Sequence, residues 1–379
     1  MTIYVYFFGM IIGIDASRAN RKQKTGIEWY SYYLIQELKK ISLDSGDKFI
    51  LYTPFKLQGS LAKLPSNWEE KILKWPPRYL WTQIRLAWDM FFHAPDLLFV
   101  PAHCLPLFSF VKKVVTVHDL GFKHFPKSYT WFQRIYYYYS HYWSLKMAQK
   151  IIVPSEFTKN DILKNFYSLR KKITVIPLGY TVKKSLSDNQ INPNLVLNKY
   201  KIKKPFFLYV GRLEKKKNVL GLIKAYQELK RSRQQQKTPN LVLVGKYGYG
   251  YTEIKKEILI SENIQEIGYI PSEDLSILYS SAFALVFPSF YEGFGLPLLE
   301  AMANKCPILA SNAGSLPEIG KTAALYFNPF KTEDIKNAML KIIENENFRQ
   351  NLIKRGIKRV QSFSWQKCAQ ATKKVLFSN

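Results

Sequence analysis

The sequence is poor in cysteine and contains no hydrophobic run long enough for a membrane-spanning helix. Its three cysteines, Cys104, Cys306 and Cys368, lie far apart and form no metal-binding or disulfide spacing. This usage argues against a disulfide-stabilised secreted domain and fits a reducing, cytoplasmic setting. The apolar stretch at residues 3–14 falls short of the ~20 residues that cross a bilayer.

That opening stretch also lacks the basic start and the small-residue cleavage site of a signal peptide. We therefore interpret residues 10–14 as the first buried strand, residues 1–9 as an upstream extension, and Met10 as an alternative start.

Acidic residues are scarce as well, with 28 Asp and Glu against 56 Lys and Arg, which gives a formal net charge of +28. Three interpretations are open: binding to nucleic acid, association with an anionic membrane leaflet, or solvated lysines without a partner. The chain has no nucleic-acid motif and no block of five consecutive basic residues. Membrane-surface association is therefore the favoured interpretation, and nucleic acid is not expected as a partner.

The 379 residues exceed the ~100–200 that one domain commonly holds, so two domains are expected. We place an N-terminal domain at residues 1–180, a polar linker at 181–204 and a C-terminal domain at 205–379. Short apolar runs predict buried strands in both, and the expected fold class is α/β. These runs lie at residues 10–14, 48–52, 96–100, 114–117, 151–153, 205–210, 241–244, 265–270, 282–287 and 307–310.

The stretch from Phe287 to Asn312 combines a strand end, a glycine-containing loop, a helix and a second strand. Pro297 suits the first turn of a helix, where its missing N–H costs nothing. Gly293 and Gly295 let the backbone approach a ligand closely. Because the start of a helix carries the positive end of its dipole, this loop favours a phosphate or an oxygen that gains negative charge.

The same stretch holds two carboxylates eight residues apart, Glu292 and Glu300. Glu292 lies in the loop, at the expected carboxyl edge of a parallel sheet, where open α/β sheets bind ligands. Glu300 lies about one turn into the helix and can accept two charge-assisted hydrogen bonds from a vicinal diol such as a ribose. These features together fit a nucleotide-sugar. The alternative is a strand-to-helix turn with solvated carboxylates.

Two other strand ends carry candidate groups. The first is an apolar strand that delivers His118 and Asp119 at its carboxyl end, where the alternative is a histidine that simply caps the strand. The second is followed by Arg212 and Lys217, and the planar guanidinium and the compact ammonium both suit a diphosphate. For the lysine run in that loop, a solvated surface is the alternative interpretation.

Two aromatic stretches of the N-terminal half are unusual. Residues 129–143 contain nine aromatic side chains in fifteen residues, too many for one face of a helix, and residues 75–92 are rich in Trp and Arg. An exposed aromatic patch usually marks a contact. We interpret residues 129–143 as a membrane-surface or acceptor platform, with ordinary packing as the alternative.

The segment Glu292-Gly293-Phe294-Gly295-Leu296-Pro297 with Glu300 resembles the E-x7-E signature of retaining glycosyltransferases of the GT-B fold, in the family numbered 4. The resemblance implies two Rossmann-like domains that face each other across a cleft. It implies that the first Glu lies beside the donor sugar and that the second binds the nucleotide ribose. It also implies that the last helix, at about residues 364–376, packs back on the first domain.

Further segments carry the same resemblance. Gly211-Arg212-Leu213 with Lys217-Asn218 is similar to the family's diphosphate-binding loop. Thr116-Val117-His118-Asp119-Leu120 is similar to its mannosyltransferase-like members, which implies that His118 faces the donor sugar and that Asp119 orients it or contacts the acceptor. The loop that ends at Thr25 and Gly26 resembles the family's cleft-lining first loop, although it lacks the double glycine common there.

The resemblance predicts a retaining, metal-independent glycosyltransferase that uses no cofactor. We expect it to transfer a hexose, best guessed as mannose from GDP-mannose, to a saccharide or lipid-linked saccharide in cell-surface polysaccharide (O-antigen or capsule type) biosynthesis. The expected location is cytoplasmic and peripheral, at the inner face of the membrane. Alternatives are a UDP- or dTDP-sugar donor, a GT-B-fold nucleotide-sugar epimerase or hydrolase, or a basic membrane- or nucleic-acid-binding module with a degenerate site.

Overall fold

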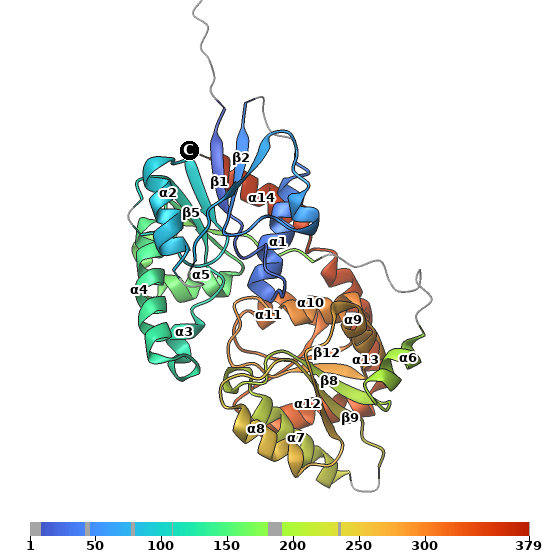
Figure 1. Ribbon diagram of the computed structural model, residues 1–379. Coiled ribbons are helices and arrows are strands. Elements are labelled where there is room, and N and C mark those ends of the chain that lie inside the picture. Colours follow the sequence, from blue (N-terminus) through green and yellow to red (C-terminus); the bar gives the residue numbers. More distant parts are fainter. Residues whose placement is uncertain are drawn as a thin grey trace, which may run out of the picture. The chain divides into compact units, whose positions relative to one another are not determined.

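A computed structural model describes residues 9–41, 46–76, 80–107, 109–180, 192–233 and 236–378 (Figure 1). The expected upstream extension therefore lies almost entirely outside the described residues. Contacts divide the chain into two compact units. Unit 1 comprises Met1–Leu120, Trp131–Gly179 and Ser364–Asn379, and unit 2 comprises Gly121–Thr130 and Tyr180–Phe363.

Unit 1 is built on a seven-stranded parallel sheet with the order β3-β2-β1-β4-β5-β6-β7. Its central strands are almost wholly buried, which is typical of a parallel sheet covered on both faces. The strands are β1 (Ile11–Asp15), β2 (Lys48–Thr53), β3 (Trp68–Ile72), β4 (Leu97–Val100), β5 (Lys112–Thr116), β6 (Lys150–Val153) and β7 (Ile173–Val175).

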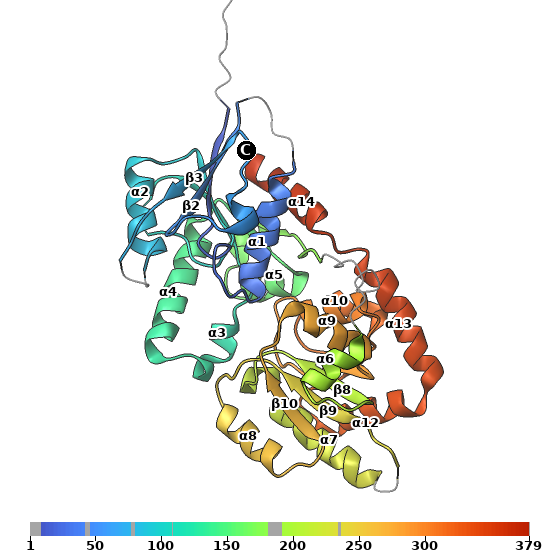
Figure 2. The same ribbon diagram turned by 45° about the vertical axis from the view of Figure 1, so that its right-hand side comes forward.

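Helices cover both faces of this sheet (Figures 1 and 2). One face carries α1 (Gly26–Leu38) and α14 (Trp365–Phe377), and the other carries α2 (Ala87–Phe92), α4 (Trp131–Met147) and α5 (Glu156–Leu163). Shorter turns are η1 (Gly59–Ala62), the π-helical η2 (Thr82–Leu86) and η4 (Tyr167–Lys172). The chain's last helix thus lies in unit 1, where the Trp365 ring stacks on Tyr33 of α1 at a centroid distance of 5.3 Å.

Unit 2 has a six-stranded parallel sheet with the order β10-β9-β8-β11-β12-β13. The two parallel, helix-covered sheets confirm the predicted Rossmann-like architecture of both halves. The strands are β8 (Phe206–Val210), β9 (Asn240–Val244), β10 (Ile264–Gly268), β11 (Ala284–Phe287), β12 (Ile308–Ser311) and β13 (Leu325–Phe327).

In unit 2, α7, α8 and α12 cover one face of the sheet, and α9 and α10 cover the other (Figure 2). The longer helices are α6 (Pro193–Lys199), α7 (Val219–Ser232), α8 (Tyr251–Leu259), α9 (Ser272–Ser281), α10 (Leu296–Ala303), α12 (Thr332–Glu344) and α13 (Glu346–Val360). The shorter ones are α3 (Gly121–His124), η3 (Pro126–Ser128), η5 (Lys215–Lys217), α11 (Leu316–Gly320) and η6 (Lys321–Ala323).

The division by contacts differs from the sequence-based division at the expected linker. Residues 192–204 are folded into unit 2, because α6 packs on α9 and Asp274 binds both Lys199 Nζ at 2.7 Å and Tyr200 Oη at 2.6 Å. Residues 121–130, which we assigned to the N-terminal domain, also count with unit 2. Among the described residues, no helix combines the length and the apolar character that crossing a bilayer requires.

Candidate active site

Two residues that the sequence singles out form an ion pair in unit 2. Lys217 Nζ contacts Glu292 Oε1, and only 16% and 13% of the two side chains are exposed. Lys217 follows β8 and Glu292 follows β11, which pair in parallel, so both residues lie at the carboxyl edge of the sheet. Topology therefore brings together groups that are 75 residues apart in the chain.

The loop that holds Glu292 is fixed by hydrogen bonds from Ser315, which follows β12. The Ser315 hydroxyl donates to the carbonyl of Phe294 at 2.8 Å and lies 3.0 Å from that of Glu292, which also accepts from the Ser315 N–H at 3.1 Å. Gly295 begins α10 with φ +104°, and a Cβ there would lie 2.6 Å from Leu316. Glycine is therefore required at this helix start. Sequence reasoning missed Ser315, because a lone serine in a turn carries no distinctive pattern.

Glu300 lies on α10, as predicted, and its position is set by a buried tyrosine. Tyr279 of α9 donates its hydroxyl to Glu300 Oε2 at 2.8 Å. Burial, followed by the charge of Glu300, holds the pKa of Tyr279 well above its ordinary value. The hydroxyl therefore stays a donor and orients the carboxylate.

Arg212 lies in the same strand-exit loop as Lys217 but points to solvent, with 62% of its side chain exposed. Its Nε lies 3.6 Å from Glu214 Oε2, and its carbonyl accepts a hydrogen bond from buried Tyr209 at 2.9 Å. The backbone of this loop is thus anchored, while the guanidinium is accessible to a ligand. Phe294, Gly293 and Leu296 complete the predicted set around the start of α10, and the first two are buried.

In unit 1, His118 is buried two residues beyond the end of β5. Its Nε2 lies 3.0 Å from the carbonyl oxygen of Pro101, and because a carbonyl only accepts, Nε2 carries the proton. Nδ1 is then the acceptor atom of the ring. The Tyr30 ring of α1 packs edge-on against the imidazole at a centroid distance of 4.7 Å. Asp119, the next residue, is half-buried.

Two further histidines surround His118. The ring of His103 lies 5.2 Å from His118 and 5.0 Å from His141 of α4, measured between centroids. His141 Nδ1 donates to the carbonyl of Tyr137 at 2.8 Å. The Nδ1 atom of His103 is buried without a hydrogen-bond partner within the described part of the chain. Its backbone has φ +44°, an unusual conformation for a non-glycine residue.

Burial is the main influence on these three imidazoles. It lowers the pKa of His118, lowers that of His103 well below the ordinary value, and lowers that of His141 to about 4. All three rings are therefore neutral at pH 7. Sequence reasoning assigned no role to His103 or His141, because nothing local shows that α4 packs against this strand end.

The predicted loop residues Thr25 and Gly26 form the start of α1. Thr25 is the N-cap, and its N–H donates to Glu28 Oε2 at 3.1 Å. Arg18 and Arg21 each place Nη1 3.4 Å from Glu28 Oε1. Burial raises the pKa of Glu28, but the hydrogen bonds from Thr25 and the two arginine charges outweigh it, so the net pKa is lowered. The basic loop is thus tied to the helix by one buried carboxylate.

The site residues fall into two groups. In unit 2, Arg212 and Lys217 lie in the loop after β8, and Glu292 and Glu300 lie before and on α10; in unit 1 the histidine cluster lies beyond β4 and β5. The described residues contain no group of three or more His, Cys, Asp or Glu with the arrangement of a metal site.

Comparisons with known proteins agree with this geometry. Family models match both halves, "Glycosyltransferase Family 4" over residues 25–184 and "Glycosyl transferases group 1" over residues 197–359. The O-antigen chain mannosyltransferase B of Escherichia coli is 30% identical over 92% of this chain and 94% of its own length. The O-antigen chain mannosyltransferase RfbU of Salmonella typhimurium is 28% identical over 71% of this chain and 70% of its own length.

The fold also matches solved structures. Sucrose-phosphate synthase from Thermosynechococcus elongatus superposes with a TM-score of 0.70 over 97% of this chain and 98% of its own, at 20% identity. This likeness confirms the predicted GT-B fold class. The family prediction is confirmed as well: this chain belongs to glycosyltransferase family 4, the glycosyl transferases group 1.

Proposed function

We propose that the protein is a mannosyltransferase of O-antigen-type polysaccharide biosynthesis, which moves mannose from GDP-mannose to a growing saccharide. The observation that carries this proposal is the Lys217–Glu292 pair beside the glycine-started helix α10. It supplies a cation for the diphosphate and a carboxylate for the sugar hydroxyls, beside a helix N-terminus that favours a phosphate. The two O-antigen mannosyltransferases that resemble this chain support the choice of sugar and pathway.

In this proposal unit 2 binds the donor. Lys217 and Arg212 bind the diphosphate and stabilise the negative charge that grows on it as the glycosidic bond breaks. Glu300, oriented by Tyr279, accepts hydrogen bonds from the ribose diol. Diphosphate binding to Lys217 frees Glu292 from the ion pair, so that its carboxylate becomes available to the sugar hydroxyls. Removing one such preorganised group typically costs ~10²–10³ in rate.

We assign the remaining chemistry to His118. Its neutral ring donates from Nε2 to Pro101, which leaves Nδ1 to accept a hydrogen bond from a sugar hydroxyl. Asp119 orients this region or contacts the acceptor, and Thr25 and Gly26 contribute to acceptor binding. The reaction proceeds with retention of the anomeric configuration and without a metal, because Arg212, Lys217 and the start of α10 neutralise the leaving group.

The proposed acceptor is a lipid-linked saccharide, and the protein works on the inner face of the cytoplasmic membrane. The net charge of +28 favours an anionic leaflet, and the exposed aromatic side chains of α2 and α4 suit the interface of a bilayer.

A thermal-shift panel with GDP, UDP, dTDP and CDP, each alone and as its sugar conjugate, tests the donor. A ligand at ~100 times its dissociation constant adds ~2.7 kcal/mol of stability. A selective shift with GDP and GDP-mannose supports the proposal, whereas a shift with UDP or dTDP alone discards mannose. The panel is followed by incubation with and without acceptor, since donor turnover without acceptor would indicate a hydrolase or epimerase instead.

A further inference from the structure

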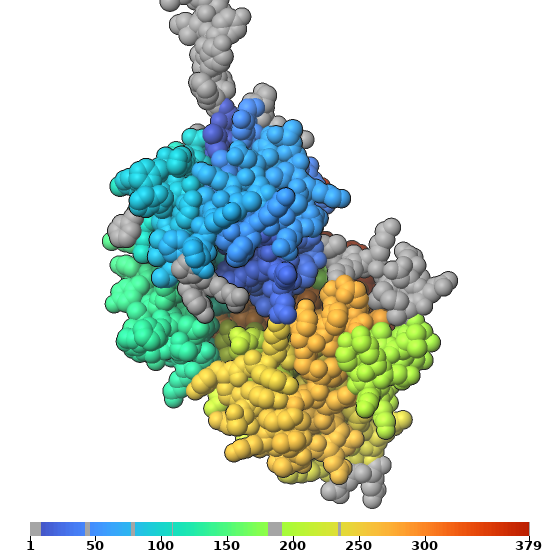
Figure 3. Space-filling view, viewed as in Figure 1, coloured from blue at the N-terminus to red at the C-terminus, as the bar shows by residue number. Residues whose placement is uncertain are grey.

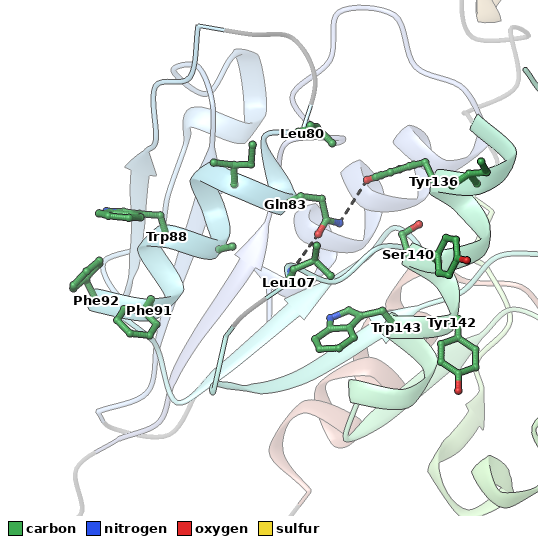
Figure 4. A pocket seen from close by; sticks show the side chains of 14 residues that line it. Leu80, Gln83, Trp88, Phe91, Phe92, Leu107, Tyr136, Ser140, Tyr142 and Trp143 are labelled. Carbon is green, nitrogen blue, oxygen red and sulfur yellow. Dashed lines mark hydrogen bonds between the residues drawn. The ribbon is translucent and has the colours of Figure 1, made fainter. Parts of the chain in front are cut away.

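Unit 1 has an open apolar groove between α2 and α4, the two helices whose exposed aromatic side chains suit the interface of a bilayer (Figure 4). Its volume is about 950 Å³, at the upper end of the ~300–1,000 Å³ of ordinary ligand pockets. One wall is formed by η2 and α2, with Ile84, Trp88 and Phe91, and the other by α4, with Ile135, Tyr139 and Tyr142. In the space-filling view these two segments, cyan and green, lie side by side on the surface of unit 1 (Figure 3).

Two polar side chains of the groove, Gln83 and Trp143, hydrogen-bond to the protein backbone. Gln83 lies between the walls, donates to the Leu105 carbonyl at 3.1 Å and accepts from the Leu107 N–H at 3.1 Å. The Trp143 indole N–H donates to the Pro106 carbonyl at 3.4 Å. The surface that remains is almost wholly hydrocarbon and aromatic ring. An occupant therefore needs to supply apolar atoms and few hydrogen bonds, which describes a hydrocarbon chain.

The helix α4 connects this groove to the histidine cluster. Tyr136 and Trp143 face the groove, whereas His141 of the same helix packs against His103, which in turn contacts His118. A molecule in the groove thus lies against the helix that also supports the proposed catalytic histidine. This continuity favours a substrate of the reaction as the occupant over an unrelated molecule.

The charges near the groove favour a ligand with an anionic head group. The sequence of α4 holds Arg134 and Lys146 and no acidic residue. Tyr142 packs against Phe166 at a centroid distance of 5.7 Å, and the turn η4 that follows Phe166 carries Arg170 and Lys171, both exposed. A lipid phosphate or diphosphate would complement these charges, whereas a second copy of a chain with net charge +28 would repel them.

We propose that the groove between α2 and α4 binds the hydrocarbon chain of the phosphate-bearing lipid that carries the saccharide acceptor. This inference rests on the proposed function in one respect, namely that the acceptor is lipid-linked. A hydrocarbon chain bound in unit 1 holds the saccharide on the same unit as His118. It also allows the protein to distinguish carrier-linked acceptors from free sugars.

Neighbouring residues of α4 provide a matched pair of variants. Tyr139 lines the groove and is 65% exposed, whereas Tyr138 is 56% exposed and lies outside the groove lining. Tyr139→Glu places a negative charge against the bound hydrocarbon chain, whereas Tyr138→Glu places the same charge one residue away, outside the groove lining. Ile84→Glu, also at an exposed position, tests the opposite wall independently.

The experiment measures binding of geranylgeranyl phosphate and of the shorter geranyl phosphate to the full-length protein, by isothermal titration calorimetry below the micelle concentration of either probe. We expect tighter binding of the longer chain. Tyr139→Glu and Ile84→Glu should weaken it roughly tenfold or more, because a charge is costly against hydrocarbon, and Tyr138→Glu should change it less than about twofold.

Several outcomes would overturn the proposal. These are absence of prenyl phosphate binding, independence of chain length, and equal losses in the Tyr138 and Tyr139 variants. Sedimentation of the same samples adds another, since a dimer that Tyr139→Glu dissociates would make the groove an interface between copies of this chain. The thermal unfolding transition, measured on every variant with and without GDP, verifies folding. It also separates the two hypotheses, because prenyl phosphate binding without nucleotide binding would reject the proposed function and leave the groove assignment intact.

Discussion

The two units present opposite kinds of chemistry at the same edge of similar sheets. Unit 2 places a charged pair, Lys217 and Glu292, in loops beside a helix N-terminus. Unit 1 buries three imidazoles that burial keeps neutral. The difference indicates that the two units have separate roles. Unit 2 neutralises the charge of the leaving group, and unit 1 offers hydrogen bonds from uncharged side chains. Each of the following predictions concerns either the charged site of unit 2 or the histidine cluster of unit 1.

The largest effect on catalysis is expected from Lys217→Ala. The ammonium is the only part-buried cation that pairs with Glu292 among the described residues, and its loss removes charge stabilisation of the leaving diphosphate. We expect kcat for sugar transfer to fall by ~10²–10³. Lys215→Ala is the control, because Lys215 pairs instead with exposed Glu253. An equal loss in both variants would indicate a general effect of surface charge rather than a specific role for Lys217.

The second prediction concerns the pH dependence of stability. The pKa of His141 is lowered from the ordinary 6.5 to about 4 in the folded protein. Between these values the unfolded chain binds more protons, so the free energy of unfolding falls as the pH falls through this window. His141 alone accounts for about 3 kcal/mol of this loss, at ~1.36 kcal/mol per pKa unit.

Urea unfolding between pH 7.5 and pH 5 measures this dependence above the range in which ordinary carboxylates titrate. His141→Gln cannot bind the proton, so its slope should be smaller than that of the unsubstituted protein. Identical slopes would show that the imidazole is already protonated or exposed in the folded state.

Glu300→Gln should weaken nucleotide binding by a moderate amount. A hydrogen bond to a charged group contributes about 1.5–3 kcal/mol, so we expect the dissociation constant of the nucleotide to rise roughly 10- to 100-fold. Titration calorimetry with the nucleoside diphosphate measures it. The matched 2′,3′-dideoxynucleotide, which lacks the diol, should bind both proteins equally, and a preference that persists with that ligand would place Glu300 away from the ribose.

The smallest effect is expected from Ser315→Ala. The lost hydroxyl donates to the carbonyl of Phe294 and lies within hydrogen-bond distance of that of Glu292, so the loop before α10 loses about 1 kcal/mol of support. Stability by thermal unfolding should fall slightly, while KM for the donor should rise. Ser232→Ala is a control outside this loop, because its hydroxyl donates to the carbonyl of Leu229 within α7. Equal KM effects in the two variants would remove any special role for Ser315.

Local sequence patterns predict most of the strands and the donor loop of unit 2. Strands such as β8 and β11 are short, fully apolar runs, and the glycines and carboxylates of the donor loop lie within nine residues of one another. The elements that the sequence analysis did not predict are edge strands or polar segments. The strand β3 reads Trp-Glu-Glu-Lys-Ile and alternates poorly, β13 has three residues, and α6 lies in a segment whose polarity indicated a linker.

The histidine cluster of unit 1 was beyond sequence reasoning for a different reason. His103 and His118 follow the adjacent strands β4 and β5, whereas His141 joins them only through the packing of helix α4. The sequence singled out the aromatic run of α4 and the Trp-rich stretch at residues 75–92 that contains α2, but it did not show that the two helices form opposite walls of one groove. Groups that meet through sheet topology can be predicted from strand ends, whereas groups that meet through helix packing cannot.

The most direct test of the central claim follows the reaction by proton NMR with GDP-mannose, an acceptor saccharide and EDTA. The account predicts a new α-mannosyl anomeric signal, hence retention, at a rate that EDTA leaves unchanged and that Lys217→Ala lowers by ~10²–10³. A β-mannosyl product, activity that EDTA removes, or full activity in the Lys217 variant would contradict it.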